Sequence, residues 1–255
     1  MEARVAVKIC GVTEPADALL CAELGAANLG LNFWPGSPRY VDLGRAREIA
    51  AAVRSCRTAA PGIALVGVFV NPTPAAVAET GAAVGLDLLQ FSGDEPAAAL
   101  RPFAPRAIKA LRSHDRAAAA AYADCWAVLF DSPAMVRTPA ALAAAAGAGE
   151  EPGAAAGDAT SPDPAAAAAP AAEYGGTRRQ WDYAAAAGAI AGSGLVRVFL
   201  AGGIGPGNVR RVVATLRPFA VDVCSGVESA PGRKDPQLLR RLFEEVSNGQ
   251  VSRPA

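Results

Sequence analysis

Short runs of apolar residues alternate with segments of helical periodicity along most of this chain. Apolar runs of roughly four to eight residues are typical of buried strands, whereas apolar residues that recur about every 3.6 positions indicate one face of a helix. Eight strands are predicted on this basis, at residues 5–10, 28–33, 64–70, 86–91, 107–112, 126–131, 196–202 and 220–225. The clearest helical segments lie at residues 15–25, 44–54, 207–217 and 235–246.

Strands that alternate with helices predict right-handed β-α-β units and therefore a parallel sheet. Eight such units in 255 residues match an α/β fold, the (β/α)8 or TIM barrel, which typically needs about 250 residues. We therefore predict a single barrel domain spanning residues 1–255. The alternative is an open, doubly wound sheet, but its glycine-rich Gly-x-Gly-x-x-Gly turn does not follow the first predicted strand.

Residues 138–173 break the alternating pattern, because they are rich in Ala, Gly and Pro and almost lack bulky apolar side chains. Such a composition cannot bury enough apolar surface to offset the ordering of the backbone, so we predict a disordered insertion. The strand count places it in the loop after the sixth strand, on the face where barrel active sites are built. A lid over the site is the alternative, since long loops in compact domains are usually either functional or disordered.

The composition is typical of a globular protein, with 52% hydrophobic and 19% charged residues. The 24 basic residues balance the 24 acidic ones, which argues against nucleic acid or an anionic membrane as a partner. No apolar run is long enough to span a bilayer, and no signal peptide is visible. The five cysteines form no Cys-x-x-Cys pair, which favours reduced thiols over disulfides or a zinc site. We therefore expect a cytoplasmic protein.

Lys8 and Cys10 lie two residues apart in the first predicted strand, within the stretch KICGVT (8–13). Residues two apart in a strand point to the same face, so both side chains are expected to project into the mouth of the barrel. A nearby ammonium group lowers the pKa of a thiol from its usual value of about 8.5 towards working pH. Cys10 is therefore a candidate thiolate base, although a cysteine packed in the core would fit the same pattern.

Three other side chains are candidates for the same site. Asp131 ends the sixth predicted strand, where a carboxylate is typical of a catalytic residue, with capping of a nearby loop as the alternative. Asp222 lies in the eighth strand, where inward polar groups can also simply pair with each other. Arg39 follows the second strand, and its planar guanidinium suits a carboxylate, either that of a substrate or that of a surface salt bridge.

Two glycine-rich loops follow the last two predicted strands, at LAGGIGPGNV (200–209) and CSGVES (224–229). In (β/α)8 barrels the loops after strands seven and eight often bind phosphate through backbone N–H groups and a short helix N-terminus. Tight turns alone would explain either loop, but two in consecutive barrel positions favour a phosphate site. The donors that we select are Gly202, Gly203, Ser225 and Gly226.

Taken together, these stretches resemble the phosphoribosylanthranilate isomerase family. The resemblance covers nearly the whole chain outside residues 138–173. The stretches that carry it are KICGVT (8–13), LNFWPGSPRYV (31–41), VGVFVN (66–71), LLQFSGDE (88–95), LFDS (129–132), GGT (175–177), LAGGIGPGNV (200–209) and VDVCSGVESAPGRKD (221–235).

The resemblance implies roles for individual residues. Cys10 matches the general base of the family, Asp131 the general acid, and Arg39 the residue that holds the anthranilate carboxylate. Asp222 falls at the position of a substrate-contacting aspartate, and we assign Lys8 to the substrate-binding residues as well.

The reaction implied is the Amadori rearrangement of N-(5-phosphoribosyl)anthranilate to 1-(2-carboxyphenylamino)-1-deoxyribulose 5-phosphate in tryptophan biosynthesis. It needs an acid and a base but no metal or organic cofactor. The expected partner is thus a small phosphorylated substrate, and the protein is expected to be a monomer or a homodimer.

Two positions depart from the pattern of the family. Ser92 stands where a histidine is usual, and Arg178 where a third glycine is common. Two rival functions also remain: a related barrel isomerase of histidine biosynthesis, or a dual-substrate version of it, and a phospho-sugar-binding barrel without activity. The first has an aspartate where this chain has Cys10, and retention of Cys10, Asp131 and Arg39 together argues against the second.

Deletion of residues 142–170, with the ends joined by a short Gly/Ser linker, should leave the melting temperature nearly unchanged. Ordering a residue costs about 1–2 kcal/mol, which this composition cannot recover, and loop length affects the closure entropy only logarithmically. We also expect kcat/KM to stay unchanged, measured beside the full-length chain. A fall of about tenfold or more in a variant that melts normally would instead identify the segment as a lid.

Overall fold

Eight parallel strands close into a barrel in the order in which they occur in the chain, and the last strand pairs with the first. The strands are β1 (Ala6–Cys10), β2 (Asn28–Asn32), β3 (Ala64–Phe69), β4 (Leu88–Phe91), β5 (Ala107–Leu111), β6 (Ala127–Phe130), β7 (Val198–Leu200) and β8 (Ala220–Val223). This computed structural model describes residues 4–56, 62–112, 116–131, 187–188 and 197–251. The prediction of a (β/α)8 barrel is confirmed, and the open doubly wound sheet is excluded because the ring of strands is closed.

Each of the eight barrel strands lies inside its predicted range. The largest difference is at β7, which the apolar pattern extended to residue 202 but which ends at Leu200. The physical reason lies just beyond, where Gly202 and Gly203 have φ angles of 86° and 62°. Backbone in this left-handed region cannot continue a strand, so the chain turns there and begins the loop that leads to the next helix.

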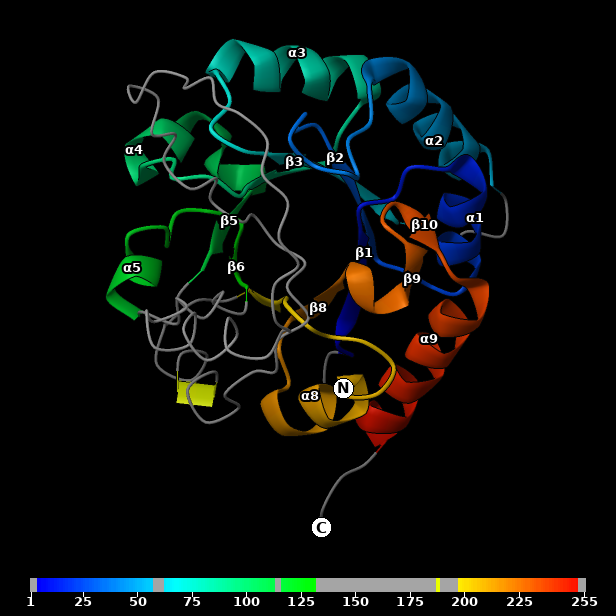
Figure 1. Ribbon diagram of the computed structural model, residues 1–255. Coiled ribbons are helices and arrows are strands. Elements are labelled where there is room, and N and C mark those ends of the chain that lie inside the picture. The colour runs from blue at the N-terminus through cyan, green and yellow to red at the C-terminus, as the bar shows by residue number, and fades with distance from the viewer. Residues whose placement is uncertain (1–3, 57–61, 113–115, 132–186, 189–196, 252–255) are drawn as a thin grey trace, which may run out of the picture. The chain divides into compact units, whose positions relative to one another are not determined.

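The helices surround the barrel, as Figure 1 shows. The helices predicted at 15–25, 44–54, 207–217 and 235–246 are observed with ends shifted by a few residues. Side-chain caps define some of the starts; Asp42, for example, accepts a hydrogen bond of 2.7 Å from the backbone N–H of Arg45. The described helices are α1 (Pro15–Glu23), α2 (Leu43–Ser55), α3 (Pro74–Val84), α4 (Ala97–Leu100), η1 (Arg101–Arg106), α5 (Arg116–Ala120), α8 (Val209–Leu216), η2 (Ser225–Val227) and α9 (Pro236–Val251).

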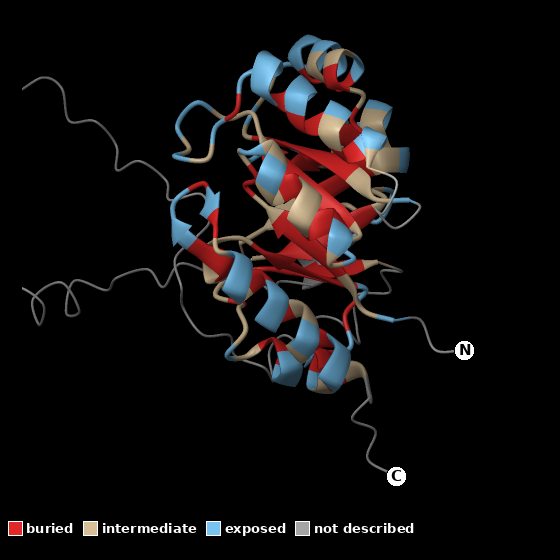
Figure 2. Ribbon diagram, turned by 90° about the vertical axis from the view of Figure 1, so that its right-hand side faces the viewer, coloured by how far each residue is buried: buried red, intermediate tan, exposed pale blue. Residues whose placement is uncertain are grey.

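The core has two layers, because successive side chains of a strand point to opposite faces. In β6, Ala127 and Leu129 belong to one apolar cluster, whereas Val128 and Phe130 belong to the larger cluster that the helices cover. Figure 2 shows the strands buried and the helices exposed on their outer faces. The cluster inside the barrel consists of Val66, Leu88, Ile108, Ala127, Leu129, Phe199, Ala201 and Ala220.

A buried ion pair fixes the loop after β4. Lys109, on β5, has its Nζ 2.6 Å from Glu95 Oε2 and 2.7 Å from the carbonyl oxygen of Gly93. The other carboxylate oxygen of Glu95 accepts hydrogen bonds from the backbone N–H groups of Asn71 and Gly93. Breaking a pair of this kind typically costs about 3–5 kcal/mol, so the loops after β3 and β4 are held firmly at the rim.

A short antiparallel hairpin follows the barrel strands, between β9 (Glu228–Ala230) and β10 (Arg233–Lys234). The sequence pattern did not predict it, because strands of three and two residues are too short to show a period. The hairpin matters for the site, since it carries Glu228 and Lys234 back towards the carboxyl end of β1.

Two sequence predictions cannot be compared with the structure. The insertion at 138–173 and the departure at Arg178 both lie outside the described residues. Among the helices that are described, none is both long enough and apolar enough to cross a membrane.

Candidate active site

A buried ion pair joins the first and last strands of the barrel. Lys8 on β1 is the register partner of Asp222 on β8, and its Nζ lies 2.7 Å from Asp222 Oδ2. The lysine side chain is 0% exposed and the aspartate 6%. Burial acts against the charge of Lys8, but the neighbouring Asp222 outweighs it, so the pKa of Lys8 is raised and the amine stays protonated. The prediction that Asp222 could pair with another inward polar group is therefore confirmed.

One carboxylate oxygen of Asp222 takes no part in this ion pair. Asp222 Oδ1 is buried and has no hydrogen-bond partner among the described residues. A buried carboxylate oxygen without a donor costs free energy, so it is rare and is commonly found where a ligand supplies the donor. Asp222 is thus held by Lys8 on one side and is an open acceptor on the other.

Two cysteines lie one step further along the same two strands. Cys10 is two residues beyond Lys8, and Cys224 is two residues beyond Asp222. A hydrogen bond from the Cys224 thiol is the main cause that lowers the pKa of Cys10 to about 7; burial acts in the opposite direction, and the positive charge of Lys8 adds to the lowering. The same hydrogen bond, together with burial, raises the pKa of Cys224.

The sequence analysis predicted that an ammonium group would lower the pKa of Cys10, and Lys8 does so. It missed Cys224, whose effect is larger. The sequence feature that could have indicated this role of Cys224 was its position at the end of the eighth predicted strand. Using it required the register between β1 and β8, which pairs Ile9 with Val223 and so brings Cys10 next to Cys224.

A second cluster of charged side chains is centred on Glu228. Arg39 donates to it from Nε to Oε1 at 2.9 Å and from Nη2 to Oε2 at 2.7 Å, and Lys234 Nζ lies 2.9 Å from Oε1. The same Nζ donates to the carbonyl oxygens of Cys10 at 2.6 Å and of Cys224 at 3.4 Å, and the Cys224 sulfur lies 3.8 Å from Glu228 Oε1. Burial raises the pKa of the Glu228 carboxyl, but Arg39 and Lys234 outweigh it and the pKa is lowered.

The sequence analysis gave a surface salt bridge as the alternative to substrate binding by Arg39. A salt bridge of Arg39 is observed, but it is largely buried. The side chain of Arg39 is 15% exposed and that of Glu228 is 3% exposed. The bidentate contact uses Nε and Nη2 of the guanidinium, and Nη1 makes no hydrogen bond to any described residue. The two residues that the sequence analysis missed here, Glu228 and Lys234, lie in the hairpin that it did not predict.

Asp131 follows directly after β6, at the carboxyl end of the strand. Its backbone N–H donates to the carbonyl oxygen of Leu111 at 2.9 Å, which continues the pairing of β6 with β5 by one residue. The side chain is half-buried. In the closed ring, β6 is separated from β1 by β7 and β8, so Asp131 and Cys10 lie at the same end of the barrel on different sides of the mouth.

The two glycine-rich loops are in direct contact. A Cβ at Gly226 would lie 2.0 Å from the carbonyl oxygen of Ile204, so only glycine allows the loop after β8 to approach the loop after β7 this closely. Asn208 braces the latter loop, accepting from the N–H of Gly205 and donating to the carbonyl of Gly203, both at 2.9 Å. Gly202, Gly203, Ser225 and Gly226 thus lie on adjoining loops at one side of the mouth.

Ser92 follows β4, at the position where the family usually has a histidine. Its hydroxyl oxygen accepts a hydrogen bond of 3.0 Å from Gln90 Nε2. Gln90 Oε1 is buried and has no partner among the described residues. The serine is thus part of a short polar contact along β4, but it offers no imidazole for proton transfer.

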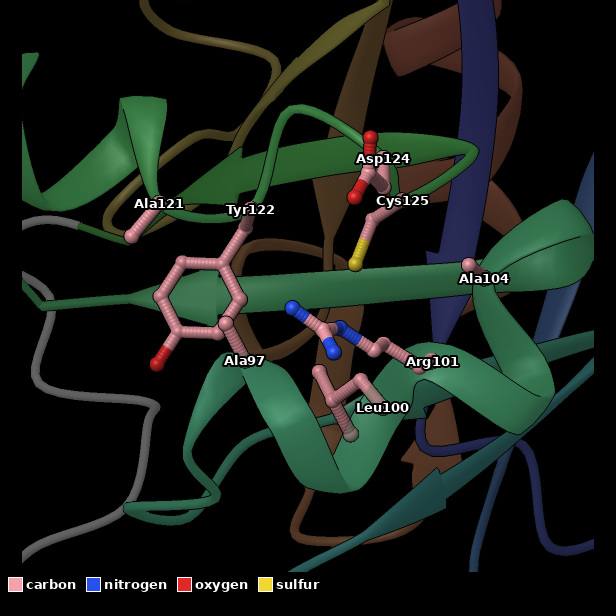
Figure 3. A pocket seen from close by; sticks show the side chains of 8 residues that line it. All are labelled: Ala97, Leu100, Arg101, Ala104, Ala121, Tyr122, Asp124 and Cys125. Atoms are coloured by element: carbon pink, nitrogen blue, oxygen red, sulfur yellow. The ribbon is translucent and has the colours of Figure 1, made fainter.

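A small cavity elsewhere in the molecule is lined by eight residues of α4, η1 and the segment before β6, among them Arg101, Tyr122 and Cys125 (Figure 3). Its volume is about 60 Å³, far below the roughly 300–1,000 Å³ of typical ligand pockets. It therefore has room for a few water molecules and not for a sugar phosphate. Within the described part of the chain, no three His, Cys, Asp or Glu side chains are grouped so that they could hold a metal ion.

The alkylation of Cys10 by iodoacetamide should accelerate with pH around a midpoint near 7, because only the thiolate reacts and the pKa is lowered to about 7. Below that pH the thiol is protonated and should be slow. In Cys224→Ala, which lacks the hydrogen-bond donor, the midpoint should rise. The measurement is the alkylation rate of the Cys10 peptide by mass spectrometry, and a midpoint near 8.5 in the parent would contradict the arrangement.

Comparison with known proteins identifies relatives over nearly the whole chain. A sequence model of the family described as N-(5'phosphoribosyl)anthranilate (PRA) isomerase matches residues 7–151 and 171–245. The N-(5'-phosphoribosyl)anthranilate isomerase of Myxococcus xanthus (strain DK1622) is 39% identical over 250 residues, which cover 96% of this chain and 97% of that protein.

Solved structures of the same enzyme are also similar. The phosphoribosyl anthranilate isomerase of Thermotoga maritima is 30% identical with a TM-score of 0.71, covering 95% of this chain and 98% of that one. A phosphoribosyl anthranilate isomerase in complex with reduced 1-(o-carboxyphenylamino)-1-deoxyribulose 5-phosphate is 28% identical with a TM-score of 0.67, at the same coverage.

The family match includes all eight barrel strands apart from the first residue of β1, and the unmatched residues 152–170 lie within the predicted insertion. It therefore favours phosphoribosylanthranilate isomerase over the histidine-pathway isomerase. A measurement of turnover distinguishes it from a phospho-sugar-binding barrel without activity. On the sequence match, the fold and the shared identity together, this chain belongs to the phosphoribosylanthranilate isomerase family.

Proposed function

We propose that this chain isomerises N-(5-phosphoribosyl)anthranilate with Cys10 as the general base and Asp131 as the general acid. The reaction itself, a step of tryptophan biosynthesis, follows from membership of the family. The assignment of residues rests chiefly on one observation. The thiol of Cys10 lies between a hydrogen-bond donor, Cys224, and the ammonium of Lys8, and its pKa is lowered to about 7. A base with a pKa near the working pH is the most effective.

The two residues suit the two proton transfers of the rearrangement. Asp131, in its protonated form, would donate a proton to the ribose ring oxygen, so that the C1′–O bond breaks and a Schiff base forms with the anthranilate nitrogen. The Cys10 thiolate would then remove the proton from C2′, and the resulting enolamine tautomerises to the ketone. Each such transfer typically contributes about 10²–10⁴-fold to the rate. Their positions on β6 and β1 allow the two groups to approach the sugar from different sides of the mouth.

Asp222 is the proposed acceptor for a sugar hydroxyl. Its Oδ1 is buried and unpartnered among the described residues, whereas Oδ2 is held by Lys8. A hydroxyl of the substrate would supply the missing donor. Lys8, which we placed with the substrate-binding residues, is completely buried; we therefore propose that it acts on the substrate through Asp222, by holding that carboxylate in a fixed orientation.

The phosphate group is proposed to bind where the two glycine-rich loops meet. The backbone N–H groups of Gly202, Gly203, Ser225 and Gly226 are the proposed donors, supported by the close contact between the loops. A related isomerase binds a reduced, phosphorylated product analogue. Binding the phosphate away from the reacting carbons would orient the sugar between Cys10 and Asp131, so that remote binding energy lowers the barrier.

Arg39 is the proposed partner of the anthranilate carboxylate. Its bidentate contact with Glu228 fixes the plane of the guanidinium, and Nη1 remains as a donor towards a ligand. A charge-assisted hydrogen bond of this kind is stronger than a neutral one. We also infer that the enzyme works in the cytoplasm, because all five of its cysteines are free thiols, and that it is a monomer or a homodimer.

The variants Cys10→Ser and Asp131→Asn should each lower kcat by about 10²–10⁴-fold. A serine hydroxyl is not a base near neutral pH, and an amide cannot donate the proton that opens the ring. Affinity for a reduced product analogue, measured by calorimetry, should change little, because neither residue is assigned to binding. Turnover is followed by the loss of substrate fluorescence.

The matched control is Cys125→Ser, which changes another half-buried cysteine outside the site and should leave kcat unchanged. Near-normal kcat in Cys10→Ser would remove Cys10 from the mechanism, and an active Asp131→Asn enzyme would show that another group is the acid.

The variant Arg39→Ala should weaken binding of the reduced product analogue by about 10- to 150-fold, which corresponds to roughly 1.5–3 kcal/mol for a charge-assisted contact. An analogue without the carboxylate should bind the variant and the parent with similar affinity. Arg45→Ala, which removes an exposed arginine paired with Glu48, serves as the control and should have no effect. Equal losses for both analogues would show that Arg39 does not hold the carboxylate.

A further inference from the structure

The register of β1 and β8 brings two thiols close together at the mouth of the barrel. The pairing of Ile9 with Val223 places Cys10, the last residue of β1, next to Cys224, which follows directly after β8. Neighbouring strands lie about 4.8 Å apart, within the roughly 4.4–6.8 Å between Cα atoms that disulfides span. Lys234 Nζ contacts the carbonyl oxygens of both cysteines, so their backbones are held together. Each thiol also shifts the pKa of the other, which places the two sulfurs within interaction range.

The two thiols differ in the way that an oxidation-sensitive pair requires. The pKa of Cys10 is lowered, so that it is largely a thiolate near neutral pH, and the pKa of Cys224 is raised. Peroxides react with thiolates, and reversible oxidation is typical of a reactive cysteine that has a second thiol beside it. Both cysteines are half-buried and lie at the carboxyl end of the strands, the face on which barrel active sites open.

Neither Cys21 nor Cys125 shares the lowered pKa of Cys10. Cys21 is completely buried in α1, and burial raises its pKa. Burial likewise raises the pKa of Cys125, which precedes β6. Cys56 follows the end of α2, on the outer layer of the barrel. The pair formed by Cys10 and Cys224 is therefore the expected first target of an oxidant.

We propose that Cys10 and Cys224 form a reversible disulfide when the enzyme meets hydrogen peroxide, and that this bond switches the enzyme off. In the first step the Cys10 sulfur attacks one peroxide oxygen, the O–O bond breaks, and a sulfenic acid and water result. In the second step the Cys224 sulfur, losing its proton, attacks the sulfenic sulfur and the S–O bond breaks with release of a second water. Two thiols are thus oxidised by two electrons, and one peroxide is reduced to two waters.

The loss of activity rests on the proposed role of Cys10 as the base, because a sulfur in a disulfide has no thiolate to accept the C2′ proton. Formation of the disulfide does not depend on that role. A small dithiol such as dithiothreitol should reduce the bond and restore activity. The disulfide also protects Cys10, since a sulfenic acid that is captured by Cys224 cannot proceed to the irreversible sulfinic acid.

The test starts from the reduced full-length chain treated with increasing hydrogen peroxide, after which free thiols are blocked with iodoacetamide and the protein is digested with trypsin without reduction. The expected product joins residues 9–39 to residues 212–233, and its mass is lower by two hydrogens than the sum of the two peptides with Cys21 carbamidomethylated. Because the first peptide also contains Cys21, fragmentation must place the link at Cys10. Activity is measured on the same samples before and after dithiothreitol.

The decisive comparison uses excess peroxide on the parent, Cys224→Ser and Cys125→Ser, each measured against its own untreated activity. The parent and Cys125→Ser should lose activity and recover most of it with dithiothreitol. Cys224→Ser cannot form the bond, so Cys10 should be overoxidised and recovery should be largely lost. The probe in every arm is hydrogen peroxide itself.

The outcomes separate this inference from the proposed function. Absence of the linked peptide at peroxide concentrations that inactivate the parent would overturn the inference, as would equal recovery in Cys224→Ser. A linked peptide in an enzyme that remains fully active would also overturn the switch, and it would at the same time remove Cys10 from the role of base. The switch is supported if the linked peptide appears as activity is lost and disappears as dithiothreitol restores activity.

Discussion

The ion pair between Lys8 and Asp222 is the interaction on which the rest of the barrel mouth depends. It joins β1 to β8 across the seam where the chain closes on itself. Removing two charges from water costs several kcal/mol for each ion unless they pair with good geometry. A slip of either strand by one residue would turn its side chains to the opposite face of the sheet and separate Lys8 from Asp222. The ion pair therefore constrains the register of the closing strands, and the register determines which residues meet at the rim.

The chemistry of the site follows from that register. Cys10 and Cys224 are the residues that come next on the two strands, and their hydrogen bond divides two identical thiols into one with a lowered pKa and one with a raised pKa. Above them, Glu228 binds Arg39 and Lys234, and Lys234 reaches back to the carbonyl oxygens of both cysteines. The cluster around Glu228 thus holds the two cysteines in the positions that the register between β1 and β8 gives them.

The same features that suit Cys10 to proton abstraction also make it sensitive to oxidation. A thiolate that is accessible to the substrate is accessible to peroxide, and the neighbour that stabilises the negative charge is also placed to capture an oxidised sulfur. A barrel with an aspartate as its base would not have this sensitivity. Catalytic power and redox response are therefore two consequences of one pair of thiols.

The sequence by itself determined the fold and most of the candidate site. The alternation of short apolar runs with helical patterns is local, and it was enough to predict eight strands and the (β/α)8 barrel, with differences only at strand ends such as that of β7. The order of the motifs also predicted Cys10, Asp131, Arg39 and the two glycine-rich loops, because each follows a recognisable strand. Their catalytic and binding roles remain predictions.

Only the tertiary structure decided which side chains meet. Asp222 is 214 residues from Lys8 along the chain, and Glu228 is 189 residues from Arg39, and no local period encodes the register between such distant strands. For that reason the sequence analysis treated Lys8 as the main influence on Cys10 and overlooked Cys224, Glu228 and Lys234. Local patterns specify elements and the faces that they bury, whereas closure of the barrel sets the contacts between its first and last strands, on which the electrostatics of the site depend.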